Sequence, residues 1–428
     1  MIVLGGVIIT FIALCVGIPI FASLAVASIL LMVYHYHQPI SNVAHVAFGA
    51  VNNFALLAMP LFIIAGNLAV AGGAAKRIIN FCNAFLGQVR GGLLVSVIVF
   101  CTLFAACSGS GLAGIAAVGT IMYPELRKDG YSPALSAGAI ASSGELGILI
   151  PPSLFFILIG MLMRVSAVSL FFAGLIPGLI MSLFLCTIAL FLARREGVVA
   201  RPTTAWKERV TVSIKSAPAL LLAVIILGGI YSGFFTPTEA ATVACVYAVF
   251  LGFVVYRELT WSKLVKTLSN AGLTTGAIYI LIATVTVFTH IISLSGFPQM
   301  LAKMIIESGM SAVMFVIILN AAVLVLTFFI DPWALMFMII PILMPVFTAL
   351  DVNLVWMGVT MCICTMIGYM TPPMAVGLYF TARLLDLPAA QVIKGIIPFL
   401  VAQALVIPVV IFFPEVALWF PRLLGFPV

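Results

Sequence analysis

The sequence predicts an all-α polytopic membrane protein, and three observations support this class. Of the 428 residues, 64% are apolar and only 7% are charged, whereas soluble globular chains have about 45–50% apolar and about 25% charged residues. The mean hydropathy is +1.32. The apolar segments run for about 20 residues, the length of a bilayer-spanning helix, and they lack the alternation over about 10 residues that marks a transmembrane β-strand.

The apolar segments give the order of the expected helices along the chain. The first of them is either one tilted helix or two short helices broken at Gly17-Ile18-Pro19, because proline interrupts a helix. All the segments together cover 2–35, 49–72, 91–107, 110–124, 132–163, 168–193, 217–233, 237–256, 272–292, 311–330, 332–349, 353–384 and 391–420.

Two pairs of short segments indicate re-entrant hairpins. The regions 91–124 and 311–349 each contain two short helices, which are joined at Ser108-Gly109-Ser110-Gly111 and at Asp331-Pro332. Several of the apolar segments are too short or too long for one simple crossing. Each pair is therefore expected to enter the membrane and return to the same side.

Each hairpin is followed by an expected discontinuous helix. The runs 132–163 and 353–384 are about 32 residues long, which exceeds the roughly 20 residues needed to cross. Pro151-Pro152 interrupts the first run and Pro372-Pro373 the second. Proline in a helix interior removes a hydrogen bond and breaks the helix.

The distribution of Lys and Arg orients the chain, because cytoplasmic ends of membrane spans are enriched in both. If the first hairpin enters from the cytoplasm and the second from outside, 16 of the 19 cationic residues face the cytoplasm. Only Arg164, Lys303 and Arg422 then lie outside. This topology puts the polar connection 194–216 in the cytoplasm and the C-terminus outside.

An internal repeat sets the architecture. A shift of residues 108–183 by 221 positions superimposes both hairpin tips, since Ser110 falls on Asp331. Because the two hairpins open to opposite sides, the repeat is inverted. Inverted repeats with broken helices are typical of secondary transporters, whose sites lie near the membrane midplane. The same shift places Pro124, Pro151, Pro152 and Pro177 on Pro345, Pro372, Pro373 and Pro398.

The tips and breaks also contain the groups that bind ions. The first tip offers two hydroxyls, freed carbonyls and glycines that permit close approach; a plain tight turn is the structural alternative. The first break, Ser142-Ser143-Gly144-Glu145-Leu146-Gly147, corresponds to Thr365-Met366-Ile367-Gly368 and the following Tyr369-Met370-Thr371 in the second. Carbonyl and hydroxyl oxygens suit a hard cation such as sodium. A structural proline kink is the alternative here.

Two carboxylates, Glu145 and Asp331, are expected deepest in the membrane, where an ionisable side chain is a functional hypothesis by default. Asp331 has a structural alternative, because Asp is a favoured N-cap and Pro332 suits the first helical turn. Thr236-Pro237-Thr238-Glu239 has the spacing of a capping box. We interpret that motif as structural.

Two amphipathic segments, 74–88 and 296–308, precede the hairpins and are expected to lie in the membrane interface. They are either simple connectors or arms that join a fixed scaffold to a moving hairpin domain. The predicted organisation is then scaffold and first arm over 1–90, first transport repeat over 91–193, cytoplasmic connection over 194–216, scaffold and second arm over 217–310, and second transport repeat over 311–428.

The combined motifs resemble the large membrane subunit of tripartite ATP-independent periplasmic (TRAP) transporters, the DctM-like family, over essentially the whole chain. This resemblance implies a sodium-driven elevator-type importer of organic acids in a bacterial inner membrane. Among members, the sequence is most similar to sialic-acid transporters, and C4-dicarboxylate members share every motif. The motifs are Ser108-Gly109-Ser110-Gly111 with Pro124 and Gly130-Tyr131, Gly144-Glu145-Leu146-Gly147 with Pro151-Pro152-Ser153, Thr236-Pro237-Thr238-Glu239-Ala240-Ala241, and Thr371-Pro372-Pro373.

The resemblance further implies the partners and the ion. The partners are a small four-helix membrane subunit and a soluble periplasmic substrate-binding protein, and sodium is the coupling ion with no other cofactor. Sodium is expected at the tip and break of each repeat, on Ser108, Ser110, Gly144 and Pro151 in the first and on Thr365, Gly368 and Thr371 in the second. The substrate carboxylate is expected between the tips, with candidate contacts at Gly109, Gly111, Ser143, Glu145, Asp331 and Pro372.

Other functions agree less well with the sequence. A sodium–dicarboxylate symporter that needs no binding protein shares the architecture. A channel is disfavoured, because broken inverted repeats imply alternating access. The sequence has no His-Glu-x-x-His, Gly-x-Ser-x-Gly or Gly-Lys motif, which disfavours an enzyme and ATP hydrolysis. Nothing in the charge pattern calls for nucleic acid.

Overall fold

The computed structural model of the chain describes residues 5, 10 and 16–428. The described part is helical and contains no strand, and eight of its helical stretches are long and apolar enough to cross a membrane. This confirms the predicted all-α membrane class. Part of the predicted first segment, 2–35, lies outside the described residues; within them, the chain bends at Gly17, which has φ +87°, and a helix begins at Ile20.

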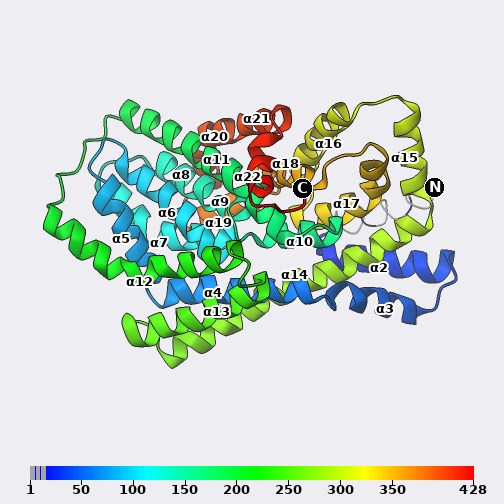
Figure 1. The fold of residues 1–428 in the computed structure, drawn as a ribbon, viewed down its shortest axis with the longest axis horizontal. Helices are drawn as coiled ribbons and strands as arrows, with labels where there is room; N and C mark the ends of the chain where they lie inside the picture. Colours follow the sequence, from blue (N-terminus) through cyan, green and yellow to red (C-terminus); the bar gives the residue numbers. More distant parts are fainter. Residues whose placement is uncertain (1–4, 6–9, 11–15) are drawn as a thin grey trace.

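The helices of the first half follow the predicted order (Figure 1). The long helix α11 contains Pro177 but stays continuous. The elements are α2 (Ile20–Leu30), η1 (Leu31–His35), α3 (Ile40–Val51), η2 (Phe54–Leu57), α4 (Ala58–Ala71), α5 (Ala74–Leu86), α6 (Gly92–Ser108), α7 (Gly111–Lys128), α8 (Pro133–Gly144), α9 (Leu146–Leu149), α10 (Leu154–Met163) and α11 (Ala167–Arg195).

The second half repeats this plan after a connection. The connection is shorter than the expected 194–216, because a helix begins at Trp206 and its first turns pack along α5, where the Ser216 hydroxyl donates to the Arg77 carbonyl at 2.8 Å. The elements are α12 (Trp206–Tyr231), α13 (Pro237–Phe250), η3 (Leu251–Val255), α14 (Trp261–Leu294), α15 (Phe297–Glu307), α16 (Ala312–Leu326), α17 (Pro332–Ala349), α18 (Leu354–Gly368), α19 (Val376–Leu384), α20 (Ala389–Ala404), α21 (Val406–Phe412) and α22 (Glu415–Leu423).

The 221-residue repeat is visible in the helix boundaries. Shifted by 221, α7 at 111–128 becomes 332–349, the range of α17, and the start of α8 at 133 becomes 354, the start of α18. The interrupted helices α8–α10 and α18–α19 have a Pro-Pro pair at corresponding positions, and both Pro-Pro peptide bonds are cis. The duplicated proline pattern therefore corresponds to a duplicated order of helices.

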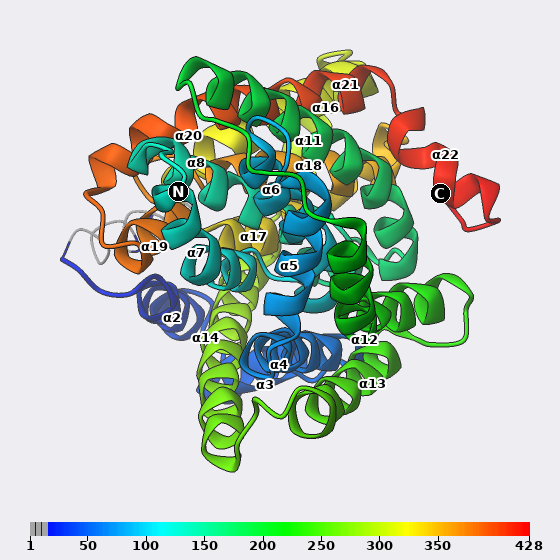
Figure 2. The same cartoon turned by 90° about the vertical axis from the view of Figure 1, so that its left-hand side faces the viewer.

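The two copies are packed differently. In the first, α6 lies against α5 and α7, and α7 lies against α8. In the second, α16 packs mainly on α18, whereas α17 packs on α14 and α15. Both views show α2, α3, α4, α13 and α14 along one side of the molecule and α8, α11, α18 and α20 along the other (Figures 1 and 2).

The motif at Thr236 is a capping box, as predicted. The Thr236 N–H donates to the Glu239 carboxylate at 2.8 Å, and the Glu239 N–H donates to the Thr236 hydroxyl at 3.3 Å. These reciprocal bonds satisfy the free N–H groups at the start of α13. No ion is needed to explain these residues.

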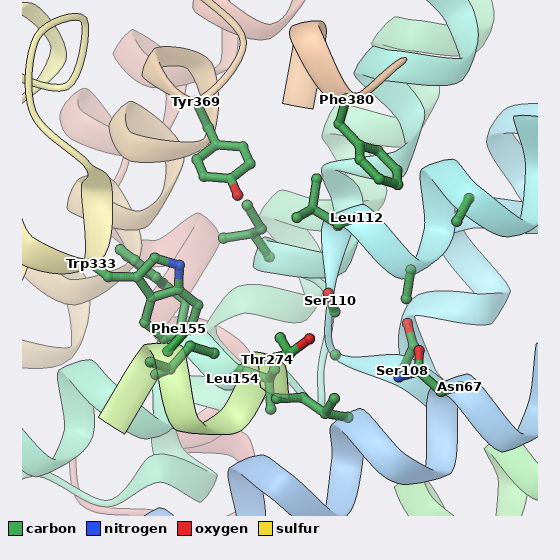
Figure 3. Close-up of a pocket in the computed structure, with 18 of the residues that line it drawn as sticks. Asn67, Ser108, Ser110, Leu112, Leu154, Phe155, Thr274, Trp333, Tyr369 and Phe380 are labelled. Atoms are coloured by element: carbon green, nitrogen blue, oxygen red, sulfur yellow. The ribbon is translucent and has the colours of Figure 1, made fainter. Parts of the chain in front are cut away.

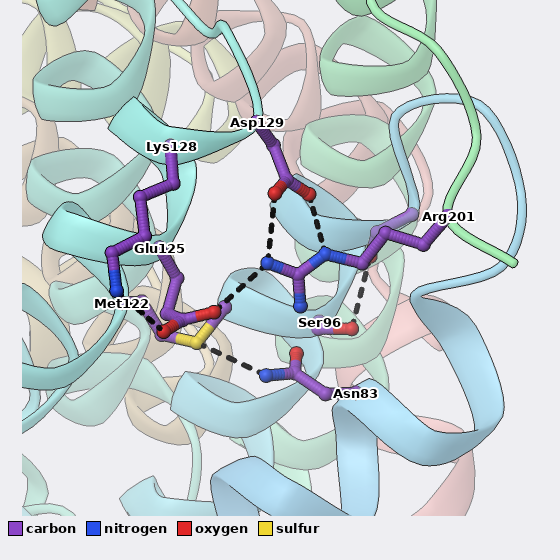
Figure 4. Close-up of polar contacts among 8 residues, drawn as sticks. Asn83, Ser96, Met122, Glu125, Lys128, Asp129 and Arg201 are labelled. Atoms are coloured by element: carbon purple, nitrogen blue, oxygen red, sulfur yellow. Dashed lines mark hydrogen bonds and ion pairs between the residues drawn. The ribbon is translucent and has the colours of Figure 1, made fainter. Parts of the chain in front are cut away.

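A polar clasp, formed by Glu125, Asp129 and Arg201, ties the connection between the halves to the end of α7 (Figure 4). The Arg201 guanidinium donates to both carboxylate oxygens of Asp129, at 2.5 and 2.9 Å, and to Glu125 at 2.9 Å. The hydrogen bond to Asp129 raises the pKa of Arg201 above its usual value. Such bidentate Arg–carboxylate pairs fix geometry as well as adding energy.

The clasp should contribute measurable stability. A double-mutant cycle with Arg201→Gln and Asp129→Asn is expected to give a coupling of about 1 kcal/mol, because both side chains are only partly exposed. Unfolding of the detergent-solubilised protein measures it. Lys128→Gln is the control, since the Lys128 side chain is 74% exposed and its ammonium lies 3.8 Å from Glu125. Additive effects of the two substitutions would show that the pair adds no stability.

Candidate functional site

A cavity of about 470 Å³ lies where the first tip (the α6–α7 turn) and the second tip (the α16–α17 turn) meet α4 and α14 (Figure 3). Both tips, both broken helices, and α4 and α14 contribute to its wall, so it joins the two repeats. Among the described residues that line it, none is Lys or Arg. The wall consists of Ile63, Asn67, Ser108, Gly109, Ser110, Gly111, Leu112, Ala113, Ala116, Ile148, Leu154, Phe155, Thr274, Ala277, Ile278, Leu281, Asp331, Trp333, Tyr369 and Phe380.

The first tip is built by the end of α6 and the start of α7. Gly109 ends α6 with φ +59°, a left-handed conformation that favours glycine. Its carbonyl accepts a hydrogen bond from Leu154 N–H at 3.3 Å, which ties the tip to the start of α10. The Ser108 hydroxyl is buried and has no hydrogen-bond partner in the part of the chain that the structure describes. An unpaired buried hydroxyl is costly, so this one is available to a ligand.

The second tip is built around Asp331. Its Oδ1 accepts from the N–H groups of Trp333 and Ala334, at 2.9 and 3.2 Å, so the side chain caps α17. Asp331 also lines the cavity, so the capping role and a place at the site coexist. The Phe328 carbonyl accepts from Met374 N–H at 3.0 Å, which joins this tip to the second break as Gly109 and Leu154 join the first.

Two glycines at corresponding positions let each tip approach its neighbouring helix. A Cβ on Gly147 would lie 3.0 Å from the carbonyl carbon and oxygen of Ser110. A Cβ on Gly368, which is 221 residues further on, would lie 1.8 Å from the Thr327 hydroxyl oxygen. Neither position leaves room for a side chain without displacing the tip.

The other predicted ion ligands are not among the described residues that line the cavity. The Thr365 hydroxyl donates to the Cys362 carbonyl at 2.8 Å, and the Thr371 hydroxyl donates to the Ile367 carbonyl at 2.9 Å. Gly144 lies at the end of α8, where a Cβ would meet the Gly111 carbonyl at 3.2 Å. Pro151 is buried in the first break and does not line the cavity.

Some of the predicted substrate contacts line the cavity and others do not. Gly109, Gly111 and Asp331 line the cavity, together with Ser108 and Ser110 from the predicted sodium sites. Ser143, Glu145 and Pro372 do not. The Ser143 hydroxyl donates to the Ala139 carbonyl at 2.5 Å. Glu145 is fully buried, and within residues 16–428 neither of its carboxylate oxygens has a hydrogen-bond partner.

The sequence analysis did not predict the cavity residues of α4 and α14 or the aromatic residues of the cavity wall. Asn67 of α4 and Thr274 of α14 face the first tip, and Asn67 lies beside Ser108 in Figure 3. The rings of Phe155 and Trp333 meet edge to face with centroids 5.3 Å apart. Asn67 was detectable, because a lone amide in an apolar span is a functional hypothesis like a charge. The aromatic residues had no such signal.

A second, smaller cavity of about 210 Å³ lies between α14 and α17. Its polar wall comes from α14, where Thr289 donates to the Phe337 carbonyl of α17 at 3.2 Å. His290 and Ser293 also line it. It shares no residue with the larger cavity.

Comparison with known proteins identifies the family. A sequence model of the family described as "Tripartite ATP-independent periplasmic transporter, DctM component" matches residues 7–416. The chain belongs to this family. The protein is thus a TRAP transporter large permease, a transporter component rather than an enzyme, and a multi-pass membrane protein, as the sequence predicted.

Several TRAP permeases resemble it to a similar degree. The C4-dicarboxylate TRAP transporter large permease protein DctM of Vibrio cholerae is 35% identical over 96% of both chains. The sialic acid permease SiaM of the same species is 34% identical over 95% of both. The ectoine permease TeaC of Halomonas elongata is 34% identical over 95% of this chain and 96% of its own. Identities this similar do not single out one substrate.

Solved structures of two other transporters share the fold. The Alcanivorax borkumensis YdaH transporter superposes with a TM-score of 0.59 at 15% identity, covering 87% of this permease and 88% of that chain. Neisseria gonorrhoeae MtrF gives 0.60 at 13% identity, covering 89% and 85%. At such low identity the likeness concerns the fold alone.

Alanine at the two close-approach glycines should loosen the tips. Gly147→Ala and Gly368→Ala are each expected to destabilise the permease by about 1–3 kcal/mol, because overpacking forces the tip to move. Thermal unfolding in detergent measures this. Gly228→Ala in α12 is the control, since among the described residues its added Cβ would meet no atom within 4 Å apart from its chain neighbours and its own helix backbone, and it should cost nothing. Equal melting temperatures for all three variants would contradict the packing argument.

Asp331 should behave as a helix cap. Asp331→Ala is expected to destabilise the permease by about 1 kcal/mol, whereas Asp331→Asn should cost only a few tenths, because Asn also caps well. Unfolding in detergent distinguishes the two. A loss in the Asn variant equal to that in the Ala variant would mean that the charge, and not the cap, supports this tip.

Proposed function

We propose that this large permease imports an organic acid with an inward sodium gradient, by an elevator movement of the two transport repeats against the scaffold. One observation carries the proposal: a single cavity is lined by both hairpin tips and by α4 and α14 of the opposite layer. A substrate bound there touches the parts that the mechanism moves relative to one another. The inverted, re-entrant arrangement inferred from the charges supplies the symmetry that alternating access uses.

Sodium has a chemically suitable site at the first tip. The Ser108 hydroxyl is buried without a partner among the residues that the structure describes, and α6 ends there, so its last carbonyls have no partners along the helix. Hydroxyl and carbonyl oxygens at a helix C-terminus favour a cation. We assign one sodium ion to Ser108, Ser110, Gly144 and Pro151, and one to Thr365, Gly368 and Thr371.

The proposed cycle follows from these assignments. A cation neutralises the negative end of α6, which favours a closed tip over the bound substrate. The closed transport repeats then move past α4 and α14, with the amphipathic helices α5 and α15 as arms. Gly109, Gly111 and Asp331 stay with the substrate as part of the cavity wall.

Sialic acid is the substrate that we favour, on the sequence resemblance described above. A C4-dicarboxylate is the second candidate, because two of the similar permeases carry that name at 35% identity. We further propose a small four-helix membrane subunit and a periplasmic binding protein as partners, a bacterial inner-membrane location and a periplasmic C-terminus. A sodium–dicarboxylate symporter without a binding protein is the alternative mechanism.

Uptake into proteoliposomes tests the proposal. The permease is reconstituted with its small subunit, and labelled sialic acid is offered with and without an inward sodium gradient and the binding protein. Uptake that requires both supports the tripartite symporter. Sodium-driven uptake of a C4-dicarboxylate instead would change the substrate and keep the mechanism, and uptake without sodium would overturn the coupling.

Removing the unpaired hydroxyl should weaken sodium activation. Ser108→Ala is expected to raise the sodium concentration for half-maximal uptake about tenfold, the effect of losing about 1.4 kcal/mol of ion binding. Ser169→Ala is a matched control, because its hydroxyl is also buried without a partner in the described part of the chain and does not line the cavity. An unchanged sodium dependence in Ser108→Ala would remove this hydroxyl from the ion site.

A further inference from the structure

Glu145 is a buried carboxylate that the proposed transport cycle does not use. Its side chain is 0% exposed, and neither carboxylate oxygen has a hydrogen-bond partner among the described residues. It does not line the cavity. A charge in this position needs compensation from its surroundings, because burying an isolated carboxylate is very costly.

Two helix N-termini lie against this carboxylate. A Cβ on Gly111, the first residue of α7, would lie 2.9 Å from both carboxylate oxygens. A Cβ on Gly377, the second residue of α19, would lie 2.7 Å from Oε1. Only glycine at these positions lets the carboxylate approach the first turns so closely.

Among the described residues, neither helix has a side-chain cap. Ser110 precedes α7 and Ala375 precedes α19, and neither makes a side-chain capping bond. By contrast, Asp331 caps α17 and Ser153 caps α10. At the start of α19 the Gly377 N–H donates to the Tyr369 carbonyl at 3.3 Å. No side chain caps either helix within the described part of the chain, and Glu145 is the carboxylate that lies beside both.

The partial positive charges of the two helix N-termini together match the charge of one carboxylate in size. A helix N-terminus acts as roughly half an elementary positive charge, so two ends together offset about one carboxylate. The effect is strongest within the first turn and in buried geometry, and both conditions hold here.

We propose that Glu145 is a positioning residue whose carboxylate is shared by the N-termini of α7 and α19. Because α7 starts at the first tip and α19 follows the second break, this charge joins a tip of one repeat to a broken helix of the other. It holds the first tip in place from behind while the cavity side of the tip stays free for ligands.

Hydrogen exchange measured by mass spectrometry tests the sharing directly and does not depend on transport. In Glu145→Gln, amides in the first two turns of both α7 and α19 should exchange roughly three- to tenfold faster. The start of α17, with its own cap, should not change. Glu239→Gln is the matched control at another helix start, and its effect should stay within α13. Faster exchange in only one of the two helices, or in neither, would overturn the proposal.

A second variant applies if Glu145→Gln does not fold. Gly111→Ala would push the carboxylate away from α7, and faster exchange at α19 would then show that the two helices are coupled through Glu145. A response confined to α7 would overturn the coupling.

The effect on uptake rests on the proposed function. Glu145→Gln should lower the maximal rate about tenfold with KM within about twofold, because the side chain holds the tip without touching the cavity. Glu145→Asp keeps the charge and should restore part of the rate. Full activity in Glu145→Gln would overturn the proposal, whereas absence of sodium-driven uptake in the unaltered protein would overturn the proposed function and leave the exchange test intact.

Discussion

The structure depends on one constraint, which is that backbone groups freed by a helix break inside a membrane find partners within the protein, since lipid offers none. Two hydrogen bonds meet part of this need, from Leu154 N–H to the Gly109 carbonyl and from Met374 N–H to the Phe328 carbonyl. Each joins a tip to a break of the same repeat. The tips and breaks therefore form one unit in each repeat, and the cavity lies where those two units face the opposite layer.

Much of the fold could be predicted from the sequence, because the constraints that shape it act on composition and on proline. Apolar length predicts the spans, and the proline positions in the two halves predict helix boundaries that agree under the 221-residue shift. The capping box at Thr236 was also predictable, since all its partners lie within four residues. The start of α12 at Trp206 was not, because those polar turns are stabilised by contacts with α5 that are distant in sequence.

The candidate site was predictable only where its residues belong to a local motif. The Ser-Gly-Ser-Gly turn and Asp331 both line the cavity. Asn67, Phe155 and Trp333 reach it from three separate helices, and no short pattern connects them. Glu145 was expected at the substrate, yet the structure turns its carboxylate toward Gly111 and Gly377. Its direction depends on where α19 lies, which local sequence does not determine.

The unequal packing of the two repeats has a consequence for how the molecule is compared with itself. In the first repeat, α6 packs against α5 and α7. In the second, α17 packs against α14 and α15 rather than against α16. The two repeats thus share one order of helices and differ in how those helices pack. Residues 221 positions apart are therefore equivalent in the repeat but have different neighbours. The effect of a substitution at one of them does not predict the effect at the other.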